Sequence, residues 1–226
     1  YVEGPSLSLE VVGDGERYYP LLETELEFDE VYDCKRVVYP IAPTSAGTLS
    51  IEELKSWSVE IARGLNLRGV MDVEVMVRDG KLYFLEIDAR LPSQTPTAVL
   101  KASQCNILAE LVTSFDDTLS GRNIKPSKAV IYEHIYVTDS SIKICGEHVM
   151  AEVRGLGLSE DFFGADEAIT NFYEAEGDWV ATLILTSKTR ERASKLHEKV
   201  IEKIMDECSI ESYIDLSPDY HDQIDL

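Results

Sequence analysis

Acidic side chains recur at alternate positions in a part of the sequence that is otherwise rich in β-forming residues. Glu86, Asp88 and Arg90 occupy every second position, so in a strand they project from one face with about 7 Å between neighbours. Glu74 lies on the preceding β-rich segment, before an Arg-Asp-Gly-Lys turn signature. Carboxylates that share a sheet face repel one another unless a cation neutralises them. Magnesium is the natural cation, because it commonly combines one or two carboxylates with substrate phosphates.

An exposed sheet face with solvated acids is the alternative to a metal site. For any single glutamate in a chain with 42 acidic and 21 basic side chains, the solvated face is the better interpretation. For the set as a whole we favour a site in which Glu74, Glu86 and Asp88 bind magnesium.

The turn between the two strands decides whether Glu74 shares the face of Glu86. Side-chain direction in a strand has a period of two, so a change of register by one residue turns the partner strand over. A two-residue Asp79-Gly80 loop would pair position 74 with 85 and point Glu74 to the other face. A three-residue loop, with Gly80 in the left-handed conformation of a bulge, would pair position 74 with 84 and place Glu74 diagonal to Glu86. Whether Glu74 joins the other carboxylates on one face therefore depends on which loop forms.

The overall composition argues against several classes of protein. The 226 residues, 44% of them hydrophobic, can bury a core and form one or two domains. The net charge of −21 would repel a polyphosphate backbone or an anionic membrane surface, so neither nucleic acid nor membrane is an expected partner. Apolar runs are much shorter than the ~20 residues of a membrane helix. Four dispersed cysteines without metal-ligand spacing fit a reducing cytoplasm.

The hydrophobic pattern predicts the elements that position the carboxylates. Residues 6–12 alternate as a strand with one apolar and one polar face. Further strands are expected at 70–77, 82–88, 129–137, 142–145, 149–153 and 179–186. Helices are expected at 51–64, 97–103 and 106–115 and in a long segment after Thr189. Turn formers at 116–128 separate two modules, so the predicted domains are 1–117, 128–216 and an acidic tail, 217–226.

The carboxylate pattern resembles the second half of the ATP-grasp ligases, which include biotin carboxylase, carbamoyl-phosphate synthase and the D-alanine ligases. Their motif is an acidic residue on one strand, about twelve positions later a Glu-x-Asn on the next strand, and often an arginine two positions further on. Glu74, Glu86, Asp88 and Arg90 match this motif. Asp88 stands where the family usually has Asn. It can still bind magnesium, but its extra negative charge favours a role in holding a cationic substrate.

Looser matches extend toward the start of the chain. Tyr1 and Val2 resemble the hinge between the two lobes, whose backbone receives the adenine. Ser8 and Glu10 resemble the strand that faces the acyl-acceptor pocket. Arg36 resembles a basic residue near the γ-phosphate, although a salt bridge to the neighbouring acidic segment is an equally good interpretation.

Three segments, 86–96, 165–173 and 178–186, are similar to the 3-methylornithine:L-lysine ligases of pyrrolysine biosynthesis. The resemblance implies an α+β fold: an ATP-grasp C-terminal lobe with an antiparallel sheet and helices, then a smaller α/β module, with the N-terminal domain missing. It implies ATP and Mg²⁺ as cofactors, activation of (3R)-3-methyl-D-ornithine as an acyl phosphate, and transfer to the ε-amine of L-lysine. The partners are then small molecules, with a homodimer as a candidate assembly. This segment alone is expected to be inactive.

The resemblance also implies a role for each matched residue. Phosphate or acyl-phosphate oxygens are stabilised by Arg90 and Arg36. The nucleotide is contacted by Tyr1, Val2, Glu74 and Glu86. The cationic diamino acids are bound by Ser8, Glu10, Asp72, Asp88 and Ser93. Taken alone, Asp72 is better explained as structural. The alternatives are another carboxylate–amine ligase, of the D-alanine or carbamoyl-phosphate type, and a nucleotide-binding module without catalysis.

Overall fold

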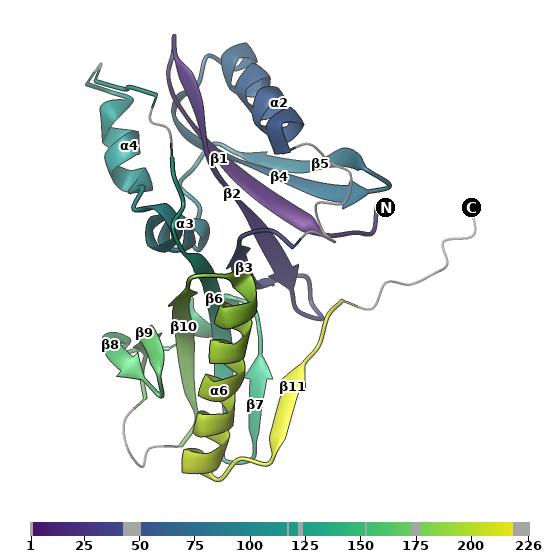
Figure 1. The fold of residues 1–226 in the computed structure, drawn as a ribbon, viewed down its shortest axis with the longest axis vertical. Coiled ribbons are helices and arrows are strands. Elements are labelled where there is room, and N and C mark those ends of the chain that lie inside the picture. Colours follow the sequence, from purple (N-terminus) through teal and green to yellow (C-terminus); the bar gives the residue numbers. More distant parts are fainter. Residues whose placement is uncertain are drawn as a thin grey trace. The chain divides into compact units, whose positions relative to one another are not determined.

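The computed structural model describes residues 2–42, 51–116, 118–121, 124–151, 153–172 and 177–218. Tyr1, with its predicted hinge role, and most of the predicted tail lie outside the described residues. The chain forms two compact units: unit 1 contains residues 1–26 and 38–130, and unit 2 contains residues 27–37 and 131–226 (Figure 1). The domains predicted from the sequence stay a prediction, and the units differ from them mainly because residues 27–37 join the C-terminal unit.

Unit 1 is an antiparallel sheet with helices, as the ATP-grasp resemblance implied. The strand order is β5-β4-β1-β2, and each neighbouring pair is antiparallel. The strands are β1 (Ser6–Asp14), β2 (Tyr18–Phe28), β4 (Arg68–Arg78) and β5 (Lys81–Asp88). The helices are α2 (Ile51–Gly64), α3 (Thr95–Ser103) and α4 (Ile107–Thr113). These elements confirm the strands and helices predicted for this part of the chain.

The two faces of the unit 1 sheet differ in polarity. Leu7 and Leu9 of β1 are fully buried on the apolar face, in a cluster that includes Leu54 of α2. This burial of apolar surface stabilises the unit by roughly 25 cal/mol per Å². The alternate residues of β1, among them Ser8 and Glu10, lie on the opposite face, as the alternation predicted. That polar face is buried as well, since Ser8 and Glu10 are both 0% exposed.

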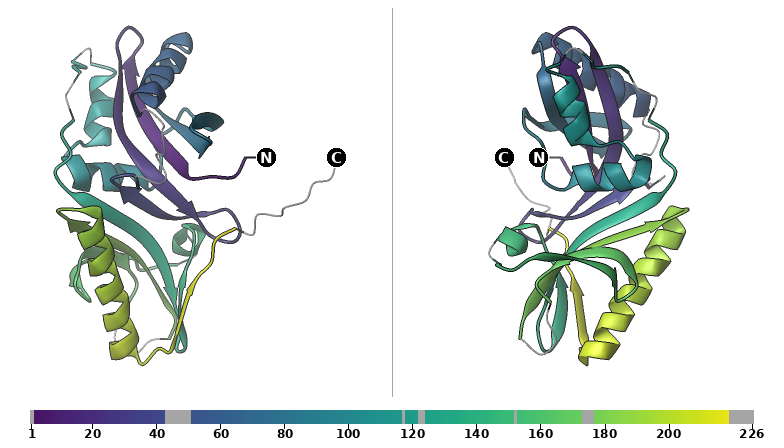
Figure 2. Two further views of the ribbon diagram at one scale, coloured as in Figure 1. Left: turned by 45° about the vertical axis from the view of Figure 1, so that its right-hand side comes forward. Right: turned by 90° about the vertical axis from the view of Figure 1, so that its left-hand side faces the viewer.

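Unit 2 contains most of β3 and β6 and all the elements that follow. Its strand order is β3-β6-β10-β9-β8, with β7 paired to β6 and to β11. The strands are β3 (Cys34–Tyr39), β6 (Ala129–Val137), β7 (Ser141–Ile144), β8 (Gly157–Phe162), β9 (Ala165–Thr170), β10 (Trp179–Ser187) and β11 (Ser212–Asp215). The helices are α5 (His148–Ala151) and α6 (Arg190–Cys208). Figure 2 shows α6 lying along the strands of this unit, where it packs on β10 and β9.

Helix α6 confirms the long helix predicted after Thr189. The Thr189 side chain accepts a hydrogen bond from the backbone N–H of Arg192 and caps the helix. The strand predicted over 149–153 is wrong, because His148–Ala151 is a short helix. A run this short has no readable period, and the backbone N–H of His148 is satisfied by the carboxylate of Asp33 at 3.0 Å rather than by a neighbouring strand.

No helix in the described part of the chain is long and apolar enough to cross a membrane. Cys34, Cys105, Cys145 and Cys208 are free cysteines.

Candidate active site

The hairpin of β4 and β5 brings the motif carboxylates together by a route that the sequence did not predict. The turn is the two-residue Asp79-Gly80 loop, with φ of 52° and 71°, so of the two loops that the sequence left open the three-residue loop is not formed. Asp-Gly suits this turn because both positions need positive φ. The register then shifts within β5, where Leu85 bulges out of the ladder between Phe84 and Glu86. The bulge restores the shared face that a regular two-residue hairpin would have lost.

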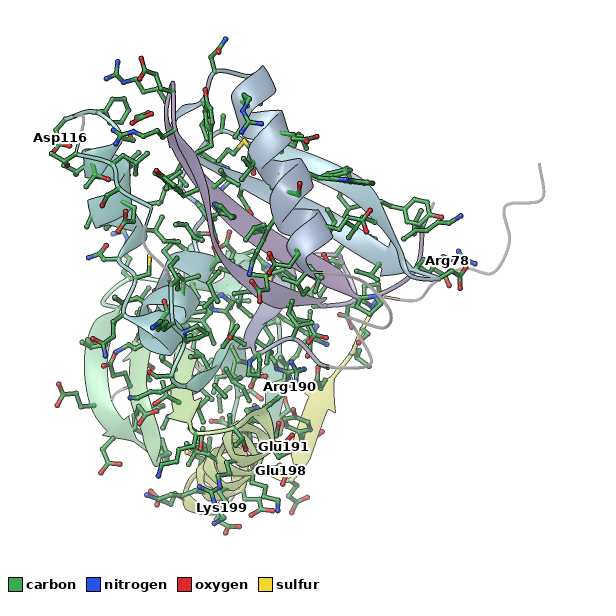
Figure 3. All side chains as sticks on the ribbon, turned by 45° about the horizontal axis from the view of Figure 1, so that its top comes forward. Arg78, Asp116, Arg190, Glu191, Glu198 and Lys199 are labelled. Carbon is green, nitrogen blue, oxygen red and sulfur yellow. The ribbon has the colours of Figure 1, made fainter. Side chains whose placement is uncertain are left out.

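The resulting register places like charges directly opposite each other. Glu74 pairs with Glu86, and Asp72 pairs with Asp88. The predicted diagonal relation of Glu74 to Glu86 is therefore replaced by a direct one. Figure 3 labels Arg78 at the turn end of this hairpin. In the register of the two strands, the paired carboxylates lie further from the turn than Arg78.

Strand β1 adds two residues to the same face. Ser8 is opposite Glu74, and Glu10 is opposite Asp72. We name the resulting set the carboxylate face; it consists of Ser8, Glu10, Asp72, Glu74, Glu86 and Asp88. Exposure rises from β1 to the edge strand: Glu10 is fully buried, Glu74 is half-buried and Glu86 is exposed.

The buried end of the carboxylate face has specific hydrogen-bond donors. The Ser8 hydroxyl donates to Asp72 Oδ1 at 2.6 Å. The hydroxyl of Thr95, the first residue of α3, donates to Glu10 Oε1. Glu10 Oε2 is buried and has no hydrogen-bond partner among the described residues. A buried carboxylate oxygen without a donor is costly, so this oxygen marks a place for a donor that the chain itself does not supply.

Burial and like charge raise the pKa values of the inner carboxylates. The pKa of Glu10 is raised to about 8, first by burial and then by Asp72. The pKa of Glu74 is raised to about 7 by burial, then by Asp72 and Glu86. The pKa of Asp72 is also raised, first by burial, while the Ser8 hydrogen bond opposes the shift. Ionisation of the carboxylate face therefore costs free energy, because the charges are buried and repel one another. A bound cation would offset this cost.

Arg90 lies beside the carboxylate face at the end of the hairpin. Its Nη2 is 2.6 Å from Asp88 Oδ2, and 62% of its side chain is exposed. The guanidinium therefore offsets part of the charge of Asp88 while most of its own surface stays accessible. Ser93, predicted to bind substrate, is exposed in the bend between β5 and α3, and Val2 is half-buried ahead of β1.

Arg36 belongs to unit 2, where its guanidinium forms ion pairs with three carboxylates. It forms ion pairs with Glu27, Glu133 and Asp215, and only 12% of its side chain is exposed. The pair with Glu27 agrees with the salt bridge to the acidic segment that the sequence left as an alternative, and Arg36 is half-buried. Its role at the γ-phosphate stays a prediction.

The residues fit a magnesium ion only if other ligands complete the site. Among the described residues, no group of three or more His, Cys, Asp or Glu side chains is arranged to hold a metal ion by itself. Glu74 and Glu86 are nevertheless adjacent across the strand pair. Two carboxylates completed by phosphate oxygens are a common magnesium environment.

Thr95 is the functional residue that the sequence reasoning missed. It falls inside the segment 86–96 used for the resemblance, but no role was predicted for it, and the helix was expected to start at 97. Only the contact between α3 and β1, which is distant in sequence, shows that its hydroxyl holds Glu10.

Curated relatives match most of the chain, although no protein-family model matches it. The 3-methyl-D-ornithine--L-lysine ligase of Methanosarcina barkeri is 36% identical over 194 residues, which is 84% of this chain and 50% of the relative. The enzyme of the same name from Methanosarcina acetivorans is 34% identical over 85% of this chain and 50% of the relative's length. The enzyme from Methanosarcina mazei is 34% identical over 88% of this chain and 51% of the relative's length. The chain thus spans about half the length of these relatives.

Solved structures with low sequence identity share the fold. Biotin carboxylase from Campylobacter jejuni has a TM-score of 0.63 at 13% identity, covering 90% of this chain and 46% of its own. The biotin carboxylase domain of the Hydrogenobacter thermophilus 2-oxoglutarate carboxylase has a TM-score of 0.61 at 16% identity, covering 89% and 46%. The chain is therefore a homologue of part of the 3-methyl-D-ornithine--L-lysine ligases, with the ATP-grasp-type fold of the biotin carboxylase domains.

Proposed function

We propose that the protein containing this chain is an ATP-dependent ligase of pyrrolysine biosynthesis. It joins the carboxylate of (3R)-3-methyl-D-ornithine to the ε-amine of L-lysine through an acyl phosphate. The names of the relatives support this substrate pair. The observation that carries the proposal is the carboxylate face, in which a fully buried Glu10 keeps one oxygen without a donor among the described residues.

The exposed end of the carboxylate face suits the phosphates of ATP. Glu74 and Glu86 would hold magnesium, with Asp88 as a further ligand, and the bound ion offsets charge on the phosphates. Binding of a cation would convert the like-charge repulsion between Glu74 and Glu86 into attraction to a common partner. Arg90, which is mostly exposed, would bind phosphate or acyl-phosphate oxygens through its free guanidinium edge.

The buried end suits a cationic amine. An ammonium group has three N–H donors and no acceptor, so it can supply the donor that Glu10 Oε2 lacks. Thr95 fixes the other oxygen of Glu10, and Ser8 fixes Asp72. Both proposed amino acids bear such an ammonium group.

A turnover experiment on the complete protein tests the proposal. ADP release would be measured with ATP and magnesium in the presence of 3-methyl-D-ornithine and L-lysine, together and singly. D-alanine and bicarbonate would be supplied in parallel as the substrates of the alternative ligase types. We expect release of ADP and formation of an amide product only with the first pair. Turnover with D-alanine or bicarbonate instead would replace the proposed substrates, and absence of any turnover would favour a non-catalytic nucleotide-binding module.

A further inference from the structure

Unit 2 contains a cavity of about 550 Å³ that the proposed ligase chemistry does not use. Its walls come from β6, β9, β10, α5 and the turn before β3, and none of its lining residues belongs to the carboxylate face. The polar residues that line it are Asp33, Tyr132, His134, Glu147, His148 and Thr182. A concave site with a few convergent polar groups and apolar walls is typical of a small-molecule site.

One ring nitrogen of His134 lacks a hydrogen-bond partner among the described residues. Its side chain is on β6 and is 2% exposed, and Nδ1 lies 2.8 Å from the Thr182 hydroxyl on β10. Nε2 is buried and has no hydrogen-bond partner among the described residues. Burial lowers the pKa of His134 to about 4, so the ring is neutral at physiological pH.

The tautomer of His134 decides what Nε2 can bind, because the Thr182 hydroxyl beside Nδ1 can either donate a hydrogen bond or accept one. Burial raises the pKa of Tyr132 to about 12, so the phenol keeps its proton at physiological pH. Thr182 has one proton to donate. If it donates to Tyr132, it accepts from Nδ1–H of His134. Nε2 is then left with a lone pair, which requires a donor.

Glu147 supplies negative charge that forms no ion pair with a described residue. Asp33 is already engaged, since its Oδ2 accepts from the ring of His148 at 2.5 Å and from the backbone N–H of His148 at 3.0 Å. Glu147 also lines the cavity, but its carboxylate forms no hydrogen bond or ion pair with any described residue. Its negative charge opposes the lowering of the His134 pKa by burial. An unpaired carboxylate and an unpaired lone pair call for the same ligand, a cationic donor.

We propose that this cavity binds the ammonium end of a primary aliphatic amine. Glu147 neutralises the ammonium charge, and Nε2 of His134 accepts one of its N–H groups. The apolar walls formed by Met150, Leu156 and Ile169 contact the methylene chain. An anion is disfavoured by Glu147 and Asp33. A metal ion is disfavoured because no group of three suitable ligands is arranged for one in the described residues. The proposal does not depend on the ligase function.

Binding to the complete protein tests the proposal without turnover. Isothermal titration with 1,5-diaminopentane, in the absence of ATP, should show saturable binding, and pentan-1-ol, which lacks the ammonium, should show none. Glu147→Gln should weaken the affinity for the diamine at least tenfold. The matched control is Glu160→Gln on β8, because Glu160 is exposed and does not line the cavity; it should leave the affinity unchanged.

A second measurement locates the amine. In protein labelled with ¹⁵N-histidine, the Nε2 resonance of His134 should shift on addition of the diamine, and this shift should be lost in Glu147→Gln. Glu10→Gln should leave the shift in place. Absence of saturable binding, equal binding by the wild type and Glu147→Gln, or loss of binding in Glu10→Gln alone would each overturn the proposal. The last result would assign the amine to the carboxylate face of unit 1.

Discussion

Glu74 on β4 lies directly opposite Glu86 on β5, and the residue that brings them face to face is the bulged Leu85 between Phe84 and Glu86. Two glutamates in direct cross-strand register destabilise a sheet unless something else compensates. Here the pKa of Glu74 is raised to about 7, first by burial and then by Asp72 and Glu86. The repulsion between these carboxylates destabilises the fold, whereas the same charges attract a cation. Carboxylates with pKa values perturbed in this way are typical of functional sites.

Removal of the Glu86 charge should separate function from stability. In the complete protein, Glu86→Gln should lower the rate of ADP release by at least tenfold, because a magnesium ligand is weakened. Its melting temperature should stay unchanged or rise, because the repulsion with Glu74 is relieved. Turnover assays and thermal melts on the same preparations measure both effects.

Unit 2 offers a matched control for Glu86→Gln. Glu160 on β8 lies directly opposite Glu167 on β9, so it repeats the cross-strand pair of glutamates away from the carboxylate face. Glu160→Gln should leave ADP release unchanged. An equal loss of turnover in both variants, or an unchanged rate in Glu86→Gln, would contradict the metal-binding role.

Substitution of Glu10 should affect binding of the amino acid more than binding of ATP. Glu10→Gln removes the carboxyl group that ionises when the cationic amine binds, so the affinity for 3-methyl-D-ornithine should fall by roughly 1 to 3 kcal/mol, the range for a charged hydrogen bond. The Michaelis constant for the amino acid should rise, while that for ATP should change little. Steady-state kinetics with each substrate varied in turn measure this difference. Equal increases for both substrates would indicate that Glu10 acts only on the structure of the unit.

The sequence predicted the faces of the unit 1 sheet because they depend on a period of two alone. The apolar Leu7 and Leu9 and the polar Ser8 and Glu10 lie where that period places them. The bulge at Leu85 was not predicted, since a loop length cannot show a register change that occurs five residues beyond the turn. Burial of the polar face was also unpredictable, because it depends on α3, which is close in space but distant in sequence.

The missed strands of unit 2 have a related cause. β8 and β9, over Gly157–Phe162 and Ala165–Thr170, contain acidic and small residues that have low β propensity. Their pairing with each other, and that of β9 with β10, fixes them as strands. Tertiary pairing of this kind overrides local preference, so no window of the sequence could show it.

The pH dependence of stability should report the protonation of Glu10. The pKa of Glu10 is raised from 4.5 to about 8 by folding, mainly through burial. The folded state therefore holds a proton that the unfolded state has released, and the stability present at low pH is lost as the pH rises to about 8. From pH 6.5 to 8, the free energy of unfolding should fall by about 1 kcal/mol per pH unit from this group. Denaturant unfolding should show a flatter slope for Glu10→Gln, and parallel slopes would contradict the raised pKa.

Thr95 should matter more when Glu10 is charged than when it is protonated. Thr95→Val keeps the shape of the side chain but removes the hydroxyl that donates to Glu10 Oε1. Hydrogen bonds to ionised acceptors are roughly twice as strong as those between neutral groups. We therefore expect Thr95→Val to lower the free energy of unfolding by about 1 to 3 kcal/mol at pH 9, and by clearly less at pH 5, where Glu10 is protonated in the folded state.

Thr113→Val on α4 is the control for Thr95→Val, because the Thr113 hydroxyl donates to the backbone carbonyl of Glu110 within its own helix. That acceptor does not titrate, so the loss in the control should be the same at pH 9 and pH 5. The hydrogen bond from Thr95 also opposes the rise in the pKa of Glu10, so its removal should move the pH-dependent loss of stability to higher pH. Chemical unfolding of the wild type and both variants at several pH values measures the two effects together. A loss in Thr95→Val that is equal at pH 5 and pH 9 would show that Thr95 fills space beside Glu10 without holding its charge.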